Sequence, residues 1–260
     1  MVKVLGARVD APTTYSPTIL EPIYRAEARS ALSITDTVCG YDCWHLYELS
    51  WLDEADRPQH YIGVLTIDCS SPATVESKSL KLYLNSLNFQ VFSSRDTAEQ
   101  TICRDLSQVV GREVDLQLLP PDGLAAITRE PAGILLDTDD AGGRRETAAG
   151  RPTNLDETLL SHRLRSLCPV TGQPDWGTVV VAYRGPSIDR AALLRQIEGF
   201  REHQDFHEHC VESLFAYVLD TYNPEKLAIT AYYQRRGGID ITPSRANYPI
   251  SSAPTRMGRQ

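Results

Sequence analysis

Two short segments of the chain carry residue types that can do chemistry. The run Cys168 to Trp176 (CPVTGQPDW) begins with a thiol and contains a carboxylate, Asp175, seven residues later. A thiolate is a strong nucleophile, and a nearby carboxyl group can transfer a proton to the group under attack. The earlier run Glu76 to Lys81 (ESKSLK) offers ammonium groups that suit phosphates. The sequence therefore contains a candidate nucleophile with a proton donor and a candidate anion-binding segment.

The lysine-containing run also has a purely structural interpretation. Glu76 or Ser77 lies where a helix would begin, and Lys78 and Lys81 are three residues apart, on one helical face. A solvated, charged helix start would have the same pattern. The run gains a functional meaning from its occurrence together with the Cys168 loop.

A second candidate anion site is Arg235-Arg236-Gly237-Gly238. Two guanidinium groups can pair with phosphate oxygens, and glycines let backbone N–H groups approach an anion closely. A plain hairpin turn with solvated arginines is the competing interpretation. Neither the G-x-G-x-x-G nor the G-x-x-x-x-G-K-[ST] pattern occurs, so a nicotinamide cofactor would not be held by the usual glycine-rich turn.

Histidines cluster just before and within a predicted helix. His203, His207, His209 and Cys210 include an i, i+4 pair that could bind zinc. No glutamate follows His203 in the H-E-x-x-H manner. The alternative is that His207 and Glu208 form a hydrogen-bonding pair at a helix start, where negative charge is stabilised. The sequence leaves both interpretations open.

The six cysteines do not indicate a disulfide framework. They include no C-x-x-C pair, and in a reducing compartment they stay thiols. Most fit the role of small buried hydrophobic residues. Cys168 differs because Pro169, Gly172 and Pro174 indicate a tight loop, and reactive groups often lie on loops of rigid scaffolds.

Charge and hydropathy exclude two broad classes of protein. The 26 Lys and Arg against 34 Asp and Glu give a net charge of −8, which argues against sequence-independent nucleic-acid binding. The longest apolar runs are far shorter than a membrane span, and the first residues lack the apolar stretch of a signal peptide. We expect a cytoplasmic protein without direct nucleic-acid or membrane contact.

Hydrophobic periodicity predicts two α+β halves joined by a polar linker. We expect an N-terminal module at 1–136, a linker at 137–154 and a C-terminal module at 155–260, each with an antiparallel sheet and two helices. Residues 157–164 fit either a short helix or a strand. The expected strands are 45–52, 60–68, 113–119, 178–183, 227–233 and 239–241, and the expected helices are 77–89, 97–110, 189–202 and 207–222.

The motifs together resemble the NADPH-dependent 7-cyano-7-deazaguanine reductases, over about Trp44 to Gln260. Their E-[SL]-K-[SA]-x-K motif matches Glu76 to Lys81, and their C-x-x-T-x-Q-P-D-W loop matches Cys168 to Trp176. The F-H-E and R-R-G-G-x-D-I patterns match residues 206–208 and 235–241. One departure is Thr242-Pro-Ser-Arg245, where asparagine and tryptophan are expected beside the proline.

The resemblance implies a fold, a reaction and a set of site residues. The fold is a tandem tunnelling fold, the assembly a homodimer, and the reaction the reduction of a deazapurine nitrile to an amine through a covalent Cys168 thioimide, in queuosine biosynthesis for tRNA modification. NADPH would be the cofactor and no metal would be needed. The implied catalytic residues are Cys168, Asp175 and His207; the implied substrate-binding residues are Thr74, Val75, Glu76, His207 and Glu208; and the implied cofactor-binding residues are Glu76, Ser77, Lys78, Arg236 and Gly237.

Two alternatives stay open at this stage. A GTP cyclohydrolase-like hydrolase of the same fold would need bound zinc. A purine- or pterin-binding module without catalysis would keep the fold but would not react through its thiol.

Overall fold

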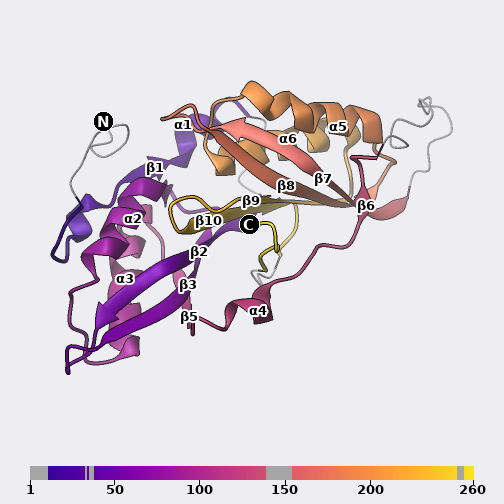
Figure 1. Ribbon diagram of the computed structural model, residues 1–260. Helices are drawn as coiled ribbons and strands as arrows, with labels where there is room; N and C mark the ends of the chain where they lie inside the picture. The colour runs from indigo at the N-terminus through magenta and orange to yellow at the C-terminus, as the bar shows by residue number, and fades with distance from the viewer. Residues whose placement is uncertain (1–10, 33, 35–37, 139–153, 251–254) are drawn as a thin grey trace. The chain divides into compact units, whose positions relative to one another are not determined.

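The computed structural model describes residues 11–32, 34, 38–138, 154–250 and 255–260 (Figure 1). Contacts divide the chain into two compact units. The first contains residues up to 27, 42–128 and 235–241, and the second contains 28–41, 129–234 and 242–260. The units are therefore not simply the two halves of the sequence, because each takes a segment from the other half. The predicted linker falls mostly on residues 139–153, outside the described residues.

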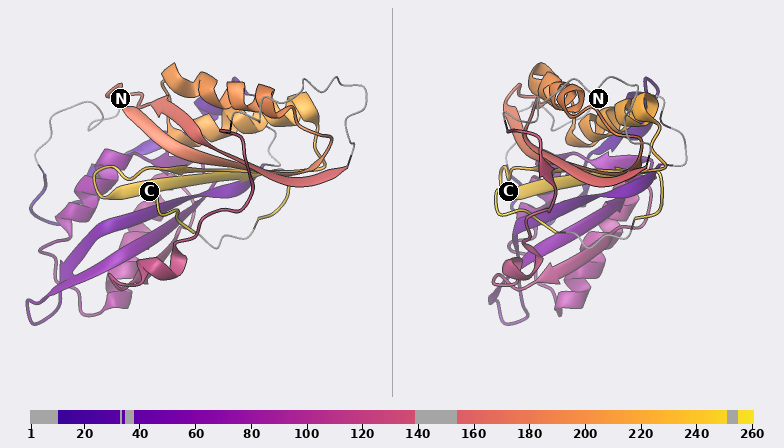
Figure 2. Two further views of the ribbon diagram at one scale, coloured as in Figure 1. Left: turned by 45° about the vertical axis from the view of Figure 1, so that its right-hand side comes forward. Right: turned by 90° about the vertical axis from the view of Figure 1, so that its right-hand side faces the viewer.

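The first unit is an antiparallel sheet with two main helices. Its strand order is β5-β3-β2-β10, and the short strands β1 and β4 pair separately. Helices α2 and α3 lie along one side of β2 and β3 (Figure 2). Asp53 shapes the β2–β3 turn by accepting the backbone N–H groups of Ala55 and Arg57. The bounds are β1 Pro22–Tyr24, β2 Cys39–Leu52, β3 Pro58–Asp68, β4 Ala73–Val75, α2 Ser77–Ser86, α3 Arg95–Val110, β5 Asp115–Leu119 and α4 Leu124–Ile127, with a 3₁₀ turn at Pro17–Ile19.

The second unit repeats this plan. Its strand order is β10-β9-β8-β7-β6, and the pairs β7–β8, β8–β9 and β9–β10 are antiparallel. Helix α5 contacts β7 and helix α6 contacts β9, and Figure 1 shows both helices over one face of these strands. The bounds are α1 Arg25–Arg29 (which crosses the unit boundary), β6 Ile134–Leu135, β7 Leu155–Leu167, β8 Pro174–Gly185, α5 Arg190–Gly199, a 3₁₀ turn Phe200–Glu202, α6 His207–Tyr222, β9 Lys226–Tyr233 and β10 Ile239–Ala246.

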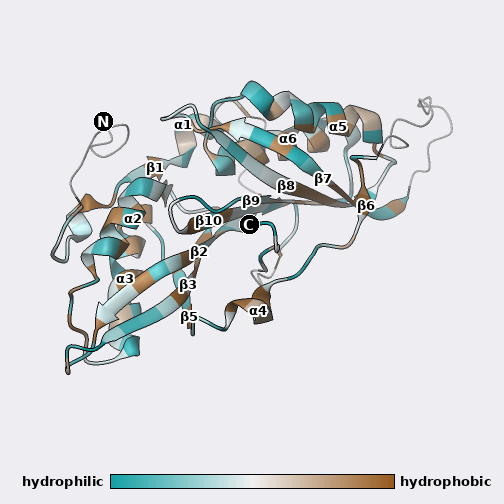
Figure 3. Ribbon diagram, in the orientation of Figure 1, coloured by the Kyte–Doolittle hydropathy of each residue, from teal (hydrophilic) through white to brown (hydrophobic). Residues whose placement is uncertain are grey.

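Each unit has its own hydrophobic core. In the first, residues such as Trp44, Leu80 and Ile102 bury the helices against the sheet, and Ile239 and Ile241 from β10 join them. In the second, alternate residues of β9 point inward beneath α6. The helices carry hydrophobic and hydrophilic residues side by side (Figure 3), as expected for helices with one face on a sheet.

The α+β fold class with antiparallel sheets is confirmed. The hairpin, both pairs of main helices and the later strands form where the periodicity predicts them. Residues 157–164, which fitted either a short helix or a strand, belong to strand β7. The main differences are that β2 begins at Cys39 rather than at residue 45, α2 ends at Ser86 rather than near residue 89, and β10 continues beyond residue 241 to Ala246. Among the described residues, no helix has the length and apolar character needed to cross a membrane.

Candidate active site

Cys168 lies in the tight connection between strands β7 and β8. The last cross-strand pair is Leu167 with Pro174, and the backbone N–H of Cys168 donates to the carbonyl of Gln173 at 2.9 Å. The N–H of Gly172 returns to the Cys168 carbonyl at 3.0 Å, and Gly172 has φ +65°, which favours glycine. The thiol is half-buried. The predicted loop is confirmed, and its backbone hydrogen bonds hold the candidate nucleophile in the β7–β8 turn.

Asp175 is placed by the same hairpin and faces the start of helix α6. It lies in β8 opposite Ser166 and is only 4% exposed. Its Oδ2 is 3.3 Å from Nε2 of His207, the first residue of α6. The His207 ring stacks on Tyr233, with centroids 3.9 Å apart and planes 20° from parallel. Strands β8 and β9 and helix α6 therefore hold a carboxylate and an imidazole in contact. The carboxylate follows directly after the turn that contains the candidate nucleophile.

Glu208 occupies the first turn of α6 and is buried. The residue before the helix is Phe206, whose side chain makes no capping hydrogen bond. The first N–H groups of a helix carry partial positive charge, which stabilises a carboxylate there. The second substrate-binding carboxylate that the resemblance implies thus lies beside His207.

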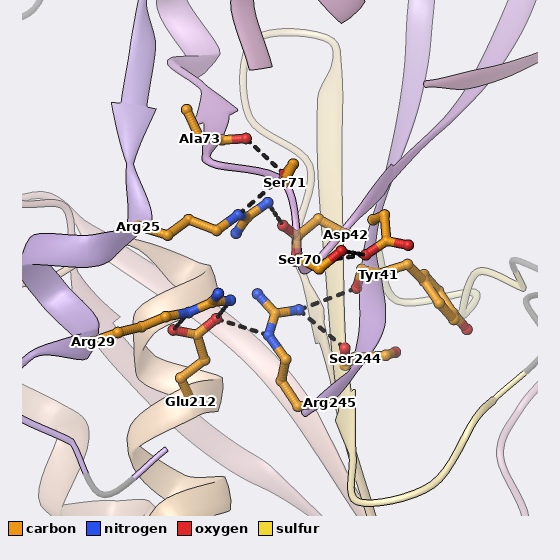
Figure 4. Close-up of polar contacts among 11 residues, drawn as sticks. Arg25, Arg29, Tyr41, Asp42, Ser70, Ser71, Ala73, Glu212, Ser244 and Arg245 are labelled. Carbon is orange, nitrogen blue, oxygen red and sulfur yellow. Dashed lines mark hydrogen bonds and ion pairs between the residues drawn. The ribbon is translucent and has the colours of Figure 1, made fainter. Parts of the chain in front are cut away.

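Helix α6 is anchored one turn further along by Glu212. Its carboxylate accepts from Arg29 Nη2 at 2.5 Å and from Arg245 Nε at 2.8 Å (Figure 4). Arg245 is fully buried and also donates to the carbonyls of Tyr41 and Ser244. The departure from the family pattern after residue 241 therefore includes a buried ion pair, which nothing in the linear sequence indicated.

The other thiols differ from Cys168 in their surroundings. Burial raises the pKa of Cys210 to about 12, and it raises the pKa of Cys43 well above its usual value. Burial together with Glu99 and Asp115 raises the pKa of Cys103 to about 11. A raised pKa keeps a thiol protonated and unreactive near neutral pH. These three cysteines fit the structural role that the sequence suggested for most of the six.

In the first unit, Glu76 is the N-cap of helix α2. Its two carboxylate oxygens accept the backbone N–H groups of Lys78 at 2.9 Å and Ser79 at 2.6 Å. Glu76 is 3% exposed, and the preceding Thr74 and Val75 are buried in β4. Ser77 and Lys78 are exposed on the first turn. The predicted helix start is confirmed, and Glu76 rather than Ser77 caps it.

The arginine–glycine run forms a tight turn at the rim of a cavity. Arg236 and Ile239 exchange backbone hydrogen bonds around Gly237 and Gly238, which have φ +59° and +81°. A cavity of about 810 Å³ lies beside this turn within the first unit. Its lining residues are Tyr47, Glu48, Leu49, Ser50, Leu52, Pro58, His60, Tyr61, Ile62, Lys81, Leu84, Asn85, Asn88, Phe89, Pro121, Arg235, Gly237, Gly238 and Ile239.

Two cations meet at this turn. Lys81 Nζ donates to the Gly237 carbonyl at 2.5 Å and pairs with Glu48 at 3.0 Å. The Arg235 guanidinium lies 4.7 Å from the ring centroid of Tyr47. Both interpretations of the run thus hold in part: it is a hairpin turn, and it places cationic groups at a cavity. Of the predicted cofactor-binding residues, Gly237 lines the cavity. Lys78 and Arg236 are not among the lining residues.

A buried polar network behind the turn escaped the sequence analysis. Asp240 accepts from Tyr47 at 2.5 Å and lies 2.6 Å from Nδ1 of His45. Arg25 donates to Asp42 at 2.6 Å in the same unit (Figure 4). The partners in each pair are distant in the sequence or belong to no recognisable motif. Their contacts therefore cannot be predicted from residue spacing.

The histidine cluster does not form in the predicted combination. His207 faces Asp175, and Cys210 is buried on α6. His203 and His209 instead face Asp205, which the sequence analysis did not select. Asp175, His207 and Glu208 belong to the second unit, whereas Glu76, Lys78 and Gly237 belong to the first.

Comparison with known proteins defines the class of protein. A family model described as "Nitrile reductase, 7-cyano-7-deazaguanine-reductase N-term" matches residues 11–118, and one described as "QueF-like protein" matches residues 174–250. The first part of the chain thus matches a nitrile reductase model, and the later part matches a QueF-like model.

Full-length relatives identify the family. "NADPH-dependent 7-cyano-7-deazaguanine reductase" of Desulfotalea psychrophila is 41% identical, with 98% of this chain and 96% of the relative covered. Proteins of the same name from Hahella chejuensis and Acinetobacter baylyi are each 42% identical and cover 98% and 99% of this chain, and 97% and 98% of their own lengths. The chain belongs to the family of NADPH-dependent 7-cyano-7-deazaguanine reductases. The resemblance found in the motifs is confirmed, and it favours an oxidoreductase over the hydrolase and the binding module.

Among solved structures, the chain is similar to the archaeosine synthase QueF-Like in the apo form. The two share 19% identity, and the match covers 38% of this chain and 98% of that chain with a TM-score of 0.33.

Proposed function

We propose that this protein reduces the nitrile of 7-cyano-7-deazaguanine to a primary amine with NADPH, through a thioimide on Cys168. The observation that carries the proposal is the pairing of Asp175 with His207 beside the rigid Cys168 turn. Family membership supplies the substrate class. As the family resemblance implies, we also propose a homodimer in the cytoplasm that takes part in queuosine biosynthesis and acts on the free deazapurine.

The first step forms a bond between the Cys168 sulfur and the nitrile carbon. The thiolate electron pair attacks the carbon, the C≡N bond becomes C=N, and the nitrogen takes up one proton. Covalent capture makes the carbon a better hydride acceptor, because the thioimide is more readily reduced than a nitrile. When bound, NADPH would supply hydride. One hydride and a second proton convert the thioimide to a tetrahedral adduct, whose C–S bond breaks to return the Cys168 thiolate and leave an iminium. A second hydride reduces the iminium to the primary amine, so that the whole reaction consumes two NADPH and two protons.

Asp175 and His207 are the groups that move the proton. Asp175 is nearly fully buried, and its contact with His207 at 3.3 Å fixes both side chains. A positioned acid or base of this kind contributes roughly 10²–10⁴-fold to a rate. Stacking on Tyr233 holds the imidazole plane, so that the proton path has one orientation.

Carboxylates are the groups that would recognise the base. A guanine-like edge presents N–H donors, and each carboxylate has about four lone-pair positions. Glu208 is buried at the first turn of α6. Glu76 uses one lone pair of each oxygen for the α2 cap and keeps the others for a ligand. We propose that both bind the base, with Thr74 and Val75 beside Glu76.

The cavity of the first unit is the proposed site for part of NADPH. Lys81 and Arg235 supply positive charge at its rim, and Gly237 brings backbone close to an anion. Ser77, Lys78 and Arg236 are the exposed neighbours on the adjacent turns. Guanidinium and ammonium groups suit the additional 2′-phosphate that distinguishes NADPH from NADH.

The decisive experiment is intact-mass measurement after mixing the protein with 7-cyano-7-deazaguanine in the absence of NADPH. The mass should rise by one substrate per chain, and Cys168→Ala should abolish the rise. Cys39→Ala is the matched control, because Cys39 is also half-buried but lies outside the β7–β8 turn, and it should keep the adduct. An adduct in Cys168→Ala, or none in the parent, would rule out the thioimide.

The cofactor site is tested separately by turnover with each nicotinamide. The parent should prefer NADPH to NADH, and Arg235→Ala should raise the KM for NADPH by about tenfold, the worth of one charge-assisted contact. Adduct formation without cofactor should not change in this variant. Equal efficiency with both cofactors in the parent, or an unchanged KM in Arg235→Ala, would place the 2′-phosphate elsewhere.

A further inference from the structure

Three potential metal ligands converge in the segment that leads into helix α6. They are His203, Asp205 and His209, and one ligand atom from each lies within 4.8 Å of the others. Asp205 Oδ2 contacts Nδ1 of His209 and lies 3.4 Å from Nε2 of His203. Two imidazoles and a carboxylate are a ligand set typical of zinc and related divalent ions.

One of the spacings between these atoms matches a metal centre as it stands, and the Asp205 and His209 atoms, which are in direct contact, would move apart around an ion. Two ligands about 2.0–2.1 Å from a zinc ion at the tetrahedral angle are roughly 3.4 Å apart, which is the distance between His203 and Asp205. In His209 the other ring nitrogen, Nε2, is buried. Nδ1, on the side of Asp205, is therefore the nitrogen that a metal would reach.

Local packing presents the ligands in this arrangement. The His203 ring meets Phe200 edge to face at 5.6 Å, and its backbone N–H donates to the Phe200 carbonyl. Asp205 precedes Phe206, the N-cap residue of α6, and its carboxylate contacts the ring of His209 in the first turn of the helix. The side chain of His203 is 44% exposed, which leaves an open path for an ion from solvent.

We propose that His203, Asp205 and His209 bind a divalent zinc-type ion at a site separate from the reacting groups. The same segment is hydrogen-bonded to the nucleophile turn. Leu167 donates to the His203 carbonyl at 2.8 Å, Asp205 donates to the Leu167 carbonyl at 3.1 Å, and Gln204 donates to the carbonyl of Cys168. An ion held here fixes the backbone that precedes Cys168.

The ion has a regulatory or stabilising role rather than a chemical one. Cys168 is covalently connected to Leu167, so ordering of the 203–205 segment limits the movement of the turn. Turnover does not need the metal, because the proposed reaction uses the thiol, Asp175 and His207. This site also differs from the zinc site considered in the sequence, since it includes Asp205 and excludes His207 and Cys210.

Equilibrium dialysis of the whole protein against Zn²⁺, with Co²⁺ absorption as a second probe, tests the proposal. We expect one ion per chain and the intense visible bands of four-coordinate Co²⁺. His203→Ala should weaken binding at least tenfold, since loss of even an outer partner of a metal ligand costs about 10–100-fold. His60→Ala removes an exposed histidine of the first unit and should leave binding unchanged.

Amide hydrogen exchange tests the link to the turn. Zn²⁺ should slow exchange at Leu167 and Asp205 in the parent and not in His203→Ala. Unchanged zinc affinity in His203→Ala would overturn the proposal, and so would loss of binding in Cys168→Ala, because the ion would then be on the nucleophile. None of these measurements depends on turnover. The zinc site can therefore be disproved while the proposed reaction stands, and the proposed reaction can be disproved while the zinc site stands.

Discussion

Helices α2 and α6 each begin beside a carboxylate that the family resemblance implies for substrate binding, but the two helices are held in different ways. Helix α2 is capped by Glu76, whose carboxylate accepts two backbone N–H groups. Helix α6 has no side-chain cap at Phe206 and is held instead by Glu212 in its second turn, through Arg245 and Arg29. In α2 the carboxylate at the helix start, Glu76, also stabilises the helix. In α6 the stabilising carboxylate, Glu212, is a different residue from those of the first turn.

This difference decides which residues can be changed without harm to the fold. In the first unit, Glu76 would have to bind substrate and start the helix at the same time. In the second unit the anchoring carboxylate is Glu212 in the second turn, and it is a different residue from the proposed site residues His207 and Glu208. Removal of a site residue should therefore cost stability in α2 and mainly activity around α6.

The largest expected effect is that of Asp175→Asn. Turnover should fall by roughly 10²–10⁴-fold because the proton donor beside His207 is lost. The thermal midpoint should change little, since asparagine keeps the shape and can still accept a hydrogen bond. Steady-state kinetics and thermal unfolding measure the two effects.

Asp156→Asn is the matched control for this variant. Asp156 lies on β7 in an exposed pair with Arg184, and its loss should alter neither quantity. Normal turnover together with a lower midpoint in Asp175→Asn would make Asp175 a structural residue.

The next effect is that of Glu212→Ala on stability. Arg245 would be left buried without its carboxylate, and removal of one partner of a buried pair costs about 3–5 kcal/mol. Urea denaturation should show this loss. Asp156→Ala breaks an exposed pair and should cost at most about 1 kcal/mol. Similar losses in the two variants would mean that the α6 anchor is weak.

Acid titration gives a second measure of the same anchor. Burial raises the pKa of Glu212, but Arg245 and Arg29 outweigh it, so the pKa in the folded protein is below its usual value. The stabilisation from this group is present above the unfolded pKa of about 4.3 and is lost as the pH falls through the folded pKa. Glu212→Gln should lose less stability than the parent below about pH 5.

The smallest effect separates Glu76 from Glu208. Glu76→Ala should weaken substrate binding and also lower the free energy of unfolding by about 1 kcal/mol, the usual worth of an N-cap. Glu208→Ala should weaken substrate binding with a smaller loss of stability. Calorimetric binding in a Cys168→Ala background, with urea denaturation, compares them. Equal losses of stability would remove the distinction between the two helices.

The sequence predicts features whose parts are close together in the chain. The Cys168 turn, the Glu76 cap and the start of α6 at His207 each depend on contacts within about seven residues, so motif and periodicity suffice to predict them. The contact between Asp175 and His207 depends on the fold, and the family resemblance implied a role for each residue but not that they touch.

The features that the sequence did not predict join distant residues. Glu212 meets Arg29 across 183 positions, and His45 meets Asp240 across 195. A charged residue looks the same in a sequence whether it is solvated or buried in a pair. Asp205 belongs to the same group of residues, because a single aspartate has no spacing pattern that distinguishes a metal ligand from a solvated carboxylate.

The exchange of segments between the two units has a consequence during translation. The first core contains Ile239 and Ile241, which the ribosome adds after nearly all of the second unit has been made. A nascent chain therefore exposes part of the first core until this late segment has emerged. A premature stop before residue 235 would leave that core without two of its members, and the truncated product would be a substrate for chaperones and proteases rather than a half-active enzyme.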